Sequence, residues 1–264
     1  MKKLTTFIIL VIFVGLSVFT SCKKESPVLP PENTFVMNNL DTNSQKNTEE
    51  TYGNWFYAAA NVTIWTTVIN IGMIVPVTAY VEALKQTPRH ISGDKWLWEY
   101  NITIVLSTYN IQLYGKFNDN DGIDWEMYIS QVGGVQDFLW FTGTQNTEGN
   151  EGQWILYKNP TENHELLKIE WTRNLSDETG TIKYTNIEPN ATENGGYIYY
   201  GNNQTGDYNA FYDIFNKGKD NLTEIELNTQ FNNGRIKDSI IFGDEIWHCW
   251  DEQLINISCP VTSK

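Results

Sequence analysis

Two hydrophobic patterns divide this chain, and the change between them falls near residue 92. The 31 residues between Glu50 and Glu82 carry no charged side chain, and their apolar spacing predicts a helix. Pro76 fits the first turn of a second helix that ends before Pro88, so we expect the apolar helix to be interrupted. A helix that is apolar on every side must be enclosed by protein or lipid. We expect it to be buried within the domain.

From Ser92 onward, apolar residues recur at every second position, as in Ile123, Trp125 and Met127. This period is typical of antiparallel strands with one apolar face and one solvated face. Turns such as Asn233-Gly234 supply the Asn and Gly residues that tight hairpins require. We therefore predict a mainly β fold of the α+β kind. About eleven strands in sequential order would curl into an antiparallel up-and-down β-barrel or deep half-barrel wrapped on the N-terminal helix.

The first 50 residues follow neither pattern. The basic pair Lys2-Lys3 precedes an uncharged apolar run from Leu4 to Phe19, and the small pair Thr20-Ser21 leads to Cys22. This order predicts a signal peptide over residues 1–21. Residues 22–50 are polar and contain prolines, so we expect a flexible tether there, followed by a single domain over residues 51–264.

The cysteine at the end of this signal resembles the lipobox of bacterial lipoproteins. Three later segments, Gly180–Asn186, Glu193–Gly201 and Trp247–Asp251, resemble a Bacteroidota family of envelope lipoproteins of uncharacterised function. The resemblance implies cleavage before Cys22, a lipid on its thiol and attachment to a bacterial envelope membrane. It supplies no catalytic residues. Because Lys23-Lys24-Glu25 lacks the Asp that favours inner-membrane retention in enterobacteria, the outer membrane is favoured, with the leaflet left open.

The charge of the chain limits its partners. Without residues 1–21, which hold two lysines and no acid, 16 Lys and Arg residues face 32 Asp and Glu residues. A net charge of about −16 repels nucleic acid and anionic headgroups, and no basic patch opposes it. Nucleic-acid binding is therefore excluded.

Cys249 and Cys259 lie ten residues apart near the end of the chain. In an oxidising compartment we expect them to form a local disulfide, which would stabilise the fold by about 2–3 kcal/mol. A metal site is the weaker interpretation, because only His248 lies nearby and structural zinc requires four ligands.

The strongest candidate for a binding site is a set of aromatic side chains that would share the concave face of the sheet. Such a lining could hold a hydrophobic or small ligand. The alternative is that these rings form an ordinary core against residues 55–84. The set contains Trp96, Trp98, Tyr100, Trp125, Trp140, Trp154, Trp171 and Tyr184.

An acidic loop over residues 118–124 makes Asp119, Asp121 and Asp124 weak candidates for a calcium site. The EF-hand register fails because it would place Phe117 at the first ligand position, and an acidic hairpin turn explains the residues. We therefore expect neither a metal nor a cofactor.

No catalytic motif accompanies the three histidines, His90, His164 and His248. The acids Glu99, Glu126 and Glu170 are expected on the polar face of strands. Our hypothesis is a non-enzymatic, lipid-anchored envelope protein that binds a hydrophobic or small ligand. Two alternatives remain open: an envelope scaffold that binds a protein partner, and a glycan hydrolase with paired carboxylates.

Overall fold

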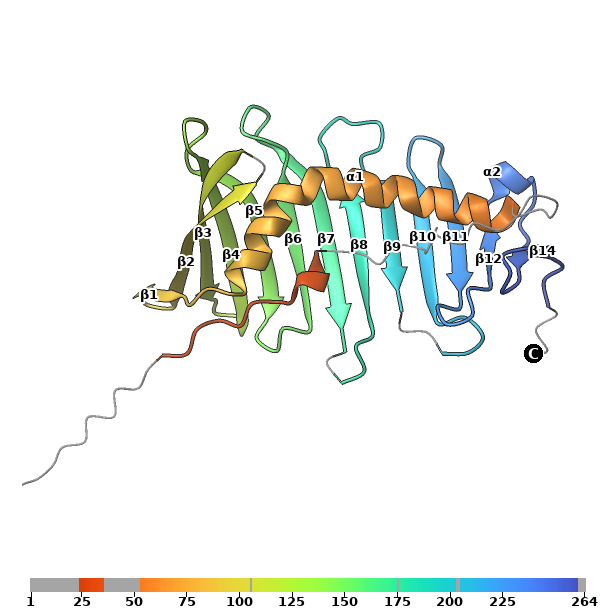
Figure 1. Cartoon of the computed structure of the whole chain (residues 1–264), viewed down its shortest axis with the longest axis horizontal. Helices are drawn as coiled ribbons and strands as arrows, with labels where there is room; N and C mark the ends of the chain where they lie inside the picture. The colour runs from red at the N-terminus through yellow and green to blue at the C-terminus, as the bar shows by residue number, and fades with distance from the viewer. Residues whose placement is uncertain (1–23, 36–52, 105, 175, 203–204, 261–264) are drawn as a thin grey trace, which may run out of the picture.

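The fold is a long, single antiparallel sheet with one helix across it. The computed structural model describes residues 24–35, 53–104, 106–174, 176–202 and 205–260. In these residues fourteen strands follow one another in chain order, each paired only with its neighbours in sequence (Figure 1). The strands are β1 (Arg89–Ser92), β2 (Lys95–Ile104), β3 (Ser107–Phe117), β4 (Gly122–Gln131), β5 (Phe138–Asn146), β6 (Glu151–Tyr157), β7 (Glu165–Arg173), β8 (Gly180–Asn186), β9 (Tyr197–Gly201), β10 (Ala210–Asn216), β11 (Asn221–Leu227), β12 (Gly234–Lys237), β13 (His248–Trp250) and β14 (Asn256–Ile257).

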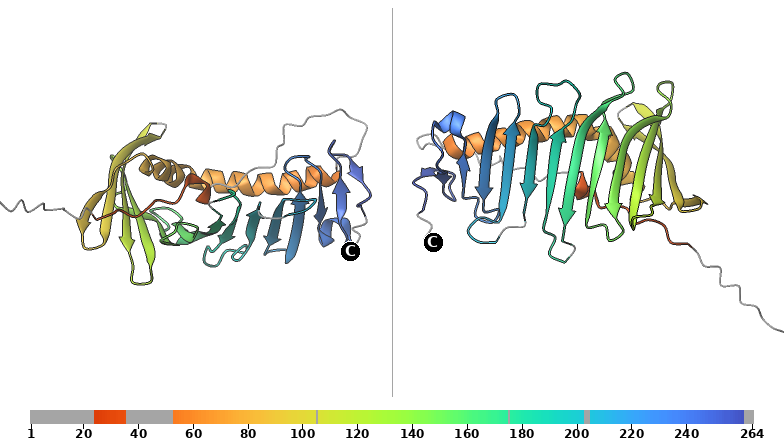
Figure 2. Two further views of the ribbon diagram at one scale, coloured as in Figure 1. Left: turned by 90° about the horizontal axis from the view of Figure 1, so that it is seen from below. Right: turned by 180° about the vertical axis from the view of Figure 1, so that it is seen from behind.

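In the described part of the chain, three helices accompany the sheet: η1 (Glu32–Thr34), α1 (Gly53–Ala83) and α2 (Ser239–Phe242). The sheet is not closed, since β1 and β14 lie at its two ends. The antiparallel up-and-down order is confirmed, whereas closure into a barrel is not: about eleven strands were expected in a barrel or deep half-barrel, and the described residues form an open sheet of fourteen. A physical reason is visible in Figure 2, where α1 lies along one face and crosses the strands. It contacts β2 near one end and β12, β13 and β14 near the other, so the strands are spread along the helix.

Helix α1 is bent. Its parts Gly53–Ile69 and Met73–Ala83 are inclined by 72°, and Pro76 lies in the first turn of the second part. Proline has no backbone N–H to bond the carbonyl four residues earlier, which explains a bend just before it. Within the described residues no one helix has both the length and the composition to cross a membrane, although the two parts pass that test together as a bent pair.

The alternation of the strands separates a buried face from a solvated one. In β4, Ile123, Trp125, Met127 and Ile129 are at most 1% exposed, and the residues between them are half-buried. The buried face forms one core with α1 residues such as Ala58. Because each strand contributes every second residue to this core, the register of the sheet is strongly fixed.

Tryptophans and glycines are paired across neighbouring strands on the buried face. At Gly143, a Cβ atom would lie only 2.1 Å from Cε3 of Trp154, so the indole occupies the space of a side chain. In each pair the glycine lies on the strand before the tryptophan and directly opposite it. The pairs are Gly115 with Trp125, Gly143 with Trp154, Gly152 with Trp171 and Gly234 with Trp250. A ring laid over a glycine covers backbone that the glycine leaves bare.

Residues 24–35 are not a flexible tether, because they are docked on the core. The ring of Phe35 is 1% exposed, and its centroid lies 4.7 Å from that of Trp154 and 4.6 Å from that of Tyr80. Two buried hydroxyls hold this segment: Tyr80 donates to the carbonyl of Pro30 at 2.5 Å and Tyr184 to that of Phe35 at 2.8 Å. The predicted signal peptide and Cys22 lie outside the described residues, as do residues 36–50 of the expected tether.

Candidate functional site

The aromatic residues that we expected to line a ligand cavity are core residues with one exception. Trp98, Trp125, Trp154 and Tyr184 are at most 2% exposed, and Trp96, Tyr100 and Trp171 are also buried. Tyr100 donates its hydroxyl to the carbonyl of Ala79 in α1 at 2.6 Å. The face that was expected to hold a ligand thus packs against α1 and Phe35.

Trp140 is the exception. The pairing of β4 with β5 shifts between Met127 and Tyr128, whose partners are Phe141 and Leu139, so Trp140 has no partner on β4. Its ring is half-buried beside Phe138, with centroids 5.4 Å apart. A bulge turns a side chain away from the face of the sheet that simple alternation predicts for it. The alternating pattern of the sequence does not show where such a bulge occurs.

A pocket of about 550 Å³ opens beside η1. Trp171 contributes to its lining, and its indole Nε1 is buried without a hydrogen-bond partner among the described residues. Most of the other lining residues are polar, with Arg173 and Glu178 as the charged ones. The indole N–H groups of Trp96 and Trp154 also lack partners there, so this feature is not particular to the pocket.

A larger hollow of about 890 Å³ lies over strands β4 to β9 on the polar face of the sheet. One row of cross-strand partners forms its floor, and we call this hollow the polar trough. The row is Asp124, Thr144, Gln153, Glu170, Lys183 and Tyr199, each residue directly opposite the next. Five strand steps of about 4.8 Å give the row a length of roughly 24 Å.

The side chains of the polar trough are mostly hydrogen-bonding groups. Hydroxyls come from Thr144, Thr172 and Thr181, and amides come from Asn118 and Gln153. The four carboxylates that line it are Asp121, Asp124, Glu151 and Glu170, against the single ammonium of Lys183. Such a lining can both donate and accept hydrogen bonds, while its excess negative charge disfavours anionic ligands.

The polar trough ends at Tyr199, and the next residue of the same row is Asp213 on β10. The pKa of Asp213 is raised to about 6, chiefly by burial and also by the nearby carboxylates of Glu224 and Glu226, while Lys237 and Lys183 act to lower it. Glu224 stands directly opposite Asp213 and forms an ion pair with Lys237. The neighbouring carboxyl groups of Asp213 and Glu224 therefore have different environments. The sequence pattern did not single out this pair because the two residues lie on separate strands.

The glutamates named from the sequence are not brought together. Glu99 pairs with Arg89 at 3.4 Å, Glu126 with Lys95 at 3.8 Å and Glu170 with Lys168 at 2.7 Å, on strands β2, β4 and β7. Because β2, β4 and β7 are not adjacent in the sheet, no two of these three acids are cross-strand partners.

The acidic loop between β3 and β4 is organised by an asparagine. The side-chain oxygen of Asn118 accepts hydrogen bonds from the backbone N–H groups of Asn120 and Gly122, both at 3.0 Å, and its amide donates to Asp124 at 2.8 Å. Among the described residues, no three His, Cys, Asp or Glu side chains are grouped to hold a metal ion. Asp119 and Asp121 therefore lie in a turn whose geometry Asn118 explains.

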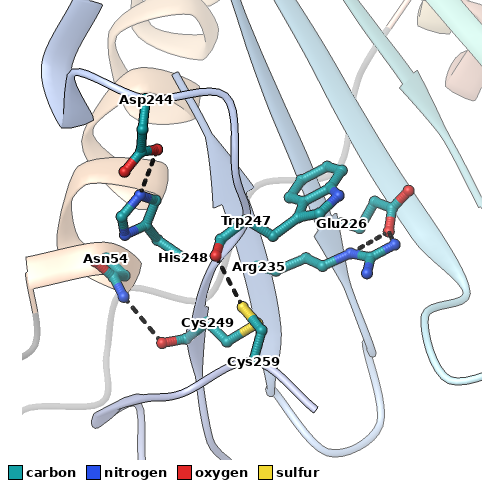
Figure 3. Close-up of a disulfide and its surroundings, with 8 residues drawn as sticks. All are labelled: Asn54, Glu226, Arg235, Asp244, Trp247, His248, Cys249 and Cys259. Carbon is teal, nitrogen blue, oxygen red and sulfur yellow. Dashed lines mark hydrogen bonds and ion pairs between the residues drawn. A yellow bond between two sulfur atoms is a disulfide. The ribbon is translucent and has the colours of Figure 1, made fainter. Parts of the chain in front are cut away.

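A disulfide joins Cys249 and Cys259 at the C-terminal end of the sheet, with an S–S distance of 2.07 Å (Figure 3). The carbonyl of Cys249 accepts a hydrogen bond of 2.9 Å from the amide of Asn54 at the start of α1. His248 contacts Asp244 at 3.0 Å, and the sulfur atoms of the two cysteines are joined to each other. The region has the features of a structural clasp.

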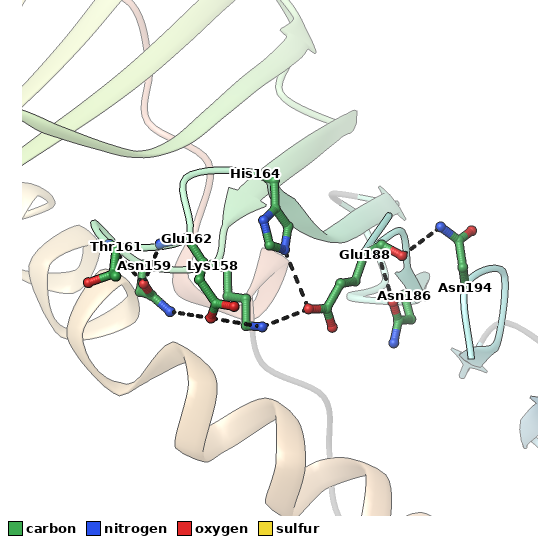
Figure 4. Close-up of polar contacts among 8 residues, drawn as sticks. All are labelled: Lys158, Asn159, Thr161, Glu162, His164, Asn186, Glu188 and Asn194. Atoms are coloured by element: carbon green, nitrogen blue, oxygen red, sulfur yellow. Dashed lines mark hydrogen bonds and ion pairs between the residues drawn. The ribbon is translucent and has the colours of Figure 1, made fainter. Parts of the chain in front are cut away.

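Figure 4 shows a polar cluster where the β6–β7 and β8–β9 loops meet. Lys158 pairs with Glu188 at 2.7 Å and with Glu162 at 3.0 Å, and His164 lies 3.4 Å from Glu188. The hydrogen bond from Lys158 is the largest cause that lowers the pKa of Glu188 below its usual value. These ion pairs tie the two loops together.

Comparison of this chain with protein-family models, curated proteins and solved structures finds no match. Any proposal for the function of the protein therefore rests on the geometry of the molecule.

Proposed function

We propose that this protein is a non-enzymatic, lipid-anchored envelope protein that binds a neutral glycan in its polar trough. The observation that carries the proposal is the unbroken row of hydrogen-bonding side chains from Asp124 to Tyr199. A linear sugar chain offers hydroxyls along its length and apolar C–H faces that stack on an aromatic ring. The trough offers complementary donors and acceptors along its floor and the ring of Tyr199 at its end.

The ligand in this proposal differs from the hydrophobic one expected from the sequence. Trp98, Trp125 and Trp154 are enclosed by protein, so their rings have no free surface to offer a ligand. The trough lies on the opposite face, where alternation places polar side chains. The excess of carboxylates there favours uncharged sugars over phosphorylated or sulfated ones.

The proposed lipid attachment at Cys22 would place the protein in a bacterial envelope. The proposal draws on the basic pair, apolar run and cysteine at the N-terminus. Metabolic labelling with palmitate checks it directly: we expect label in the full chain and none in a Cys22→Ser variant.

Calorimetric titration with neutral linear oligosaccharides tests the glycan proposal. We expect Tyr199→Ala to weaken binding by about tenfold, a loss of ~1.4 kcal/mol, because the ring provides the stacking surface. Glu170→Gln should also weaken binding. The control is Tyr128→Ala, which removes a half-buried tyrosine of the same face outside the trough and should change affinity less than twofold. Equal losses in the two tyrosine variants, or no binding by the parent protein, would contradict the proposal.

Glycan hydrolysis is a second candidate, favoured by the pairing of Asp213 with Glu224 beside the trough. Side chains directly opposite in antiparallel strands have Cβ atoms about 4.5–5.5 Å apart, which allows their carboxyl groups to reach the separation of about 5–5.5 Å used by a retaining acid and nucleophile. Asp213, with its raised pKa, would protonate the leaving oxygen as the glycosidic bond breaks and Glu224 attacks the anomeric carbon to form a glycosyl ester. A water molecule deprotonated by Asp213 would then hydrolyse this ester and restore both carboxyl groups. Release of reducing ends that both Asp213→Asn and Glu224→Gln abolish, with binding retained, would establish this activity in place of simple binding.

A further inference from the structure

Helix α1 has an exposed face without charge. The side chains of Phe56, Ile64, Val68 and Ile74 are between 58% and 66% exposed, and Thr63 and Thr67 lie between them. We call these six residues the outer stripe of α1. Residues 51–81 carry no charged side chain, and the outer stripe is their part on the solvent side of the helix.

This exposure departs from what the sequence predicts. The opposite side of α1 is buried in the core, with Ala58, Val62 and Ala79 at most 1% exposed. A helix on a sheet normally carries charged or polar residues on its solvent side. Single exposed apolar side chains are common, but a row of them along a helix whose one charged residue is Glu82, next to its C-terminal end, marks a surface that contacts something apolar.

The N-terminal segment brings a bilayer within reach of this surface. Lys24 is held against the β1–β2 turn, where its ammonium contacts the carboxylate of Asp94 and, at 2.6 Å, the carbonyl of Gly93. Cys22 lies only two residues before it, a span of at most about 7 Å of extended chain. A lipid on Cys22 would therefore hold the domain directly against the membrane.

We propose that the outer stripe of α1 lies in the interfacial region of a phospholipid bilayer, alongside the acyl chains attached to Cys22. This inference rests on the proposed lipid attachment. The stripe contains no charge, whereas the chain as a whole is acidic, so the contact depends on burial of apolar surface and not on anionic lipids. Helix α1 lies along one face of the sheet (Figure 2). The polar trough lies on the other face and consequently points away from the bilayer.

An environment-sensitive NBD fluorophore tests the contact on the full-length, lipidated protein in phosphatidylcholine vesicles. Single cysteines replace Ile64 or Val68 in the stripe, and Thr172→Cys, exposed on the opposite face, is the matched control. We expect blue-shifted emission, quenched by nitroxide-labelled lipid, at positions 64 and 68, with a water-like spectrum at position 172. High salt should leave the shift unchanged.

The remaining outcomes separate this inference from the proposal on which it rests. If the protein floats with the vesicles while positions 64 and 68 report water, lipid attachment stands and the bilayer contact is wrong. If the protein does not float, and Cys22→Ser behaves identically, both fail. A blue shift without vesicles that grows with protein concentration assigns the stripe to a second copy of the chain and overturns the bilayer contact.

Discussion

Asp213 is a carboxyl group in a partly desolvated position on the polar face of the sheet. Glu224 stands opposite it on one side and Tyr199 on the other. Its pKa of about 6 compares with 3.8 in an unstructured chain. Between these two values the unfolded chain releases the proton while the folded chain retains it. Stability therefore falls as the pH rises from about 4 to 6 and stays lower above 6.

We predict that Asp213→Asn removes this part of the pH dependence. Above pH 6 the variant should be more stable than the parent by about 1 kcal/mol, a value reduced from the full linkage because solvent screens a group that is half exposed. Urea unfolding at several pH values between 4 and 7 measures the difference. Asp119→Asn, in an exposed turn, is the control. If the free energy of unfolding of Asp213→Asn changes with pH as steeply as that of the parent, the pH dependence does not come from Asp213.

At the scale of single residues, the sequence predicts features that depend on residues close by in the chain. It does not predict the position of a side chain that depends on a neighbouring strand. The spacing of Cys249 and Cys259 predicted their disulfide because a short loop can close on itself. The half-buried position of Trp140 depends on a register shift against β4, and the pairing of Asp213 with Glu224 depends on the alignment of two strands. Alternation within one segment contains neither piece of information.

Glycines act at the scale of the element by leaving room for indole rings from the next strand. Gly143 is the tightest case, because a Cβ atom there would also lie 2.9 Å from the carbonyl of Gln153, which cannot move aside freely. The cost of a methyl group at this position is therefore set by the ring of Trp154 and by the backbone.

We predict that Gly143→Ala lowers the free energy of unfolding by about 1–3 kcal/mol, because the indole must leave its site. Near-ultraviolet circular dichroism should report the displaced ring, and urea unfolding the energy. Gly53→Ala is the matched control, since its nearest neighbour would be the amide of Asn256 at 3.5 Å. In combination with Trp154→Leu the loss should be smaller than the sum of the single losses. If the losses of the two single variants add in the double variant, the contact between the new methyl group and the indole is not the cause of the destabilisation.

The elements themselves could be predicted well from their periodicity. The alternation placed strands such as β4 and β7, and the uncharged run placed α1 with its interruption near Pro76. The short strands at the two ends, β1 and β14, are too brief to show a period. A barrel or deep half-barrel was expected because a sheet of many strands curls, and the sequence does not reveal that α1 runs across the strands from β2 to β14.

The N-terminal segment is part of the whole molecule's core. Its peptide carbonyls accept hydrogen bonds from three distant elements: Tyr80 in α1, Gln145 in β5 and Tyr184 in β8. A polar, proline-containing sequence was read as a tether because its one anchoring ring, Phe35, stands alone without a period around it.

We predict that Phe35→Ala lowers the free energy of unfolding by about 3–5 kcal/mol, as expected when a buried aromatic side chain is removed. Amide hydrogen exchange in residues 26–35 should become faster while that of the central strands keeps its rank order. Val28→Ala, whose side chain is 69% exposed, serves as the comparison and should stay within about 0.5 kcal/mol. A loss in Phe35→Ala as small as that would mean that the segment is only loosely attached.

The meander topology would permit duplication of a hairpin without disturbing any existing strand pair, because each strand bonds only to its neighbours in sequence. Helix α1, however, touches β2 near one end and β12 to β14 near the other, and its 31 residues span about 46 Å at most. Two added strands would lengthen the sheet by about 10 Å, which the helix could not follow. The length of α1 therefore limits how many hairpins the sheet can gain or lose.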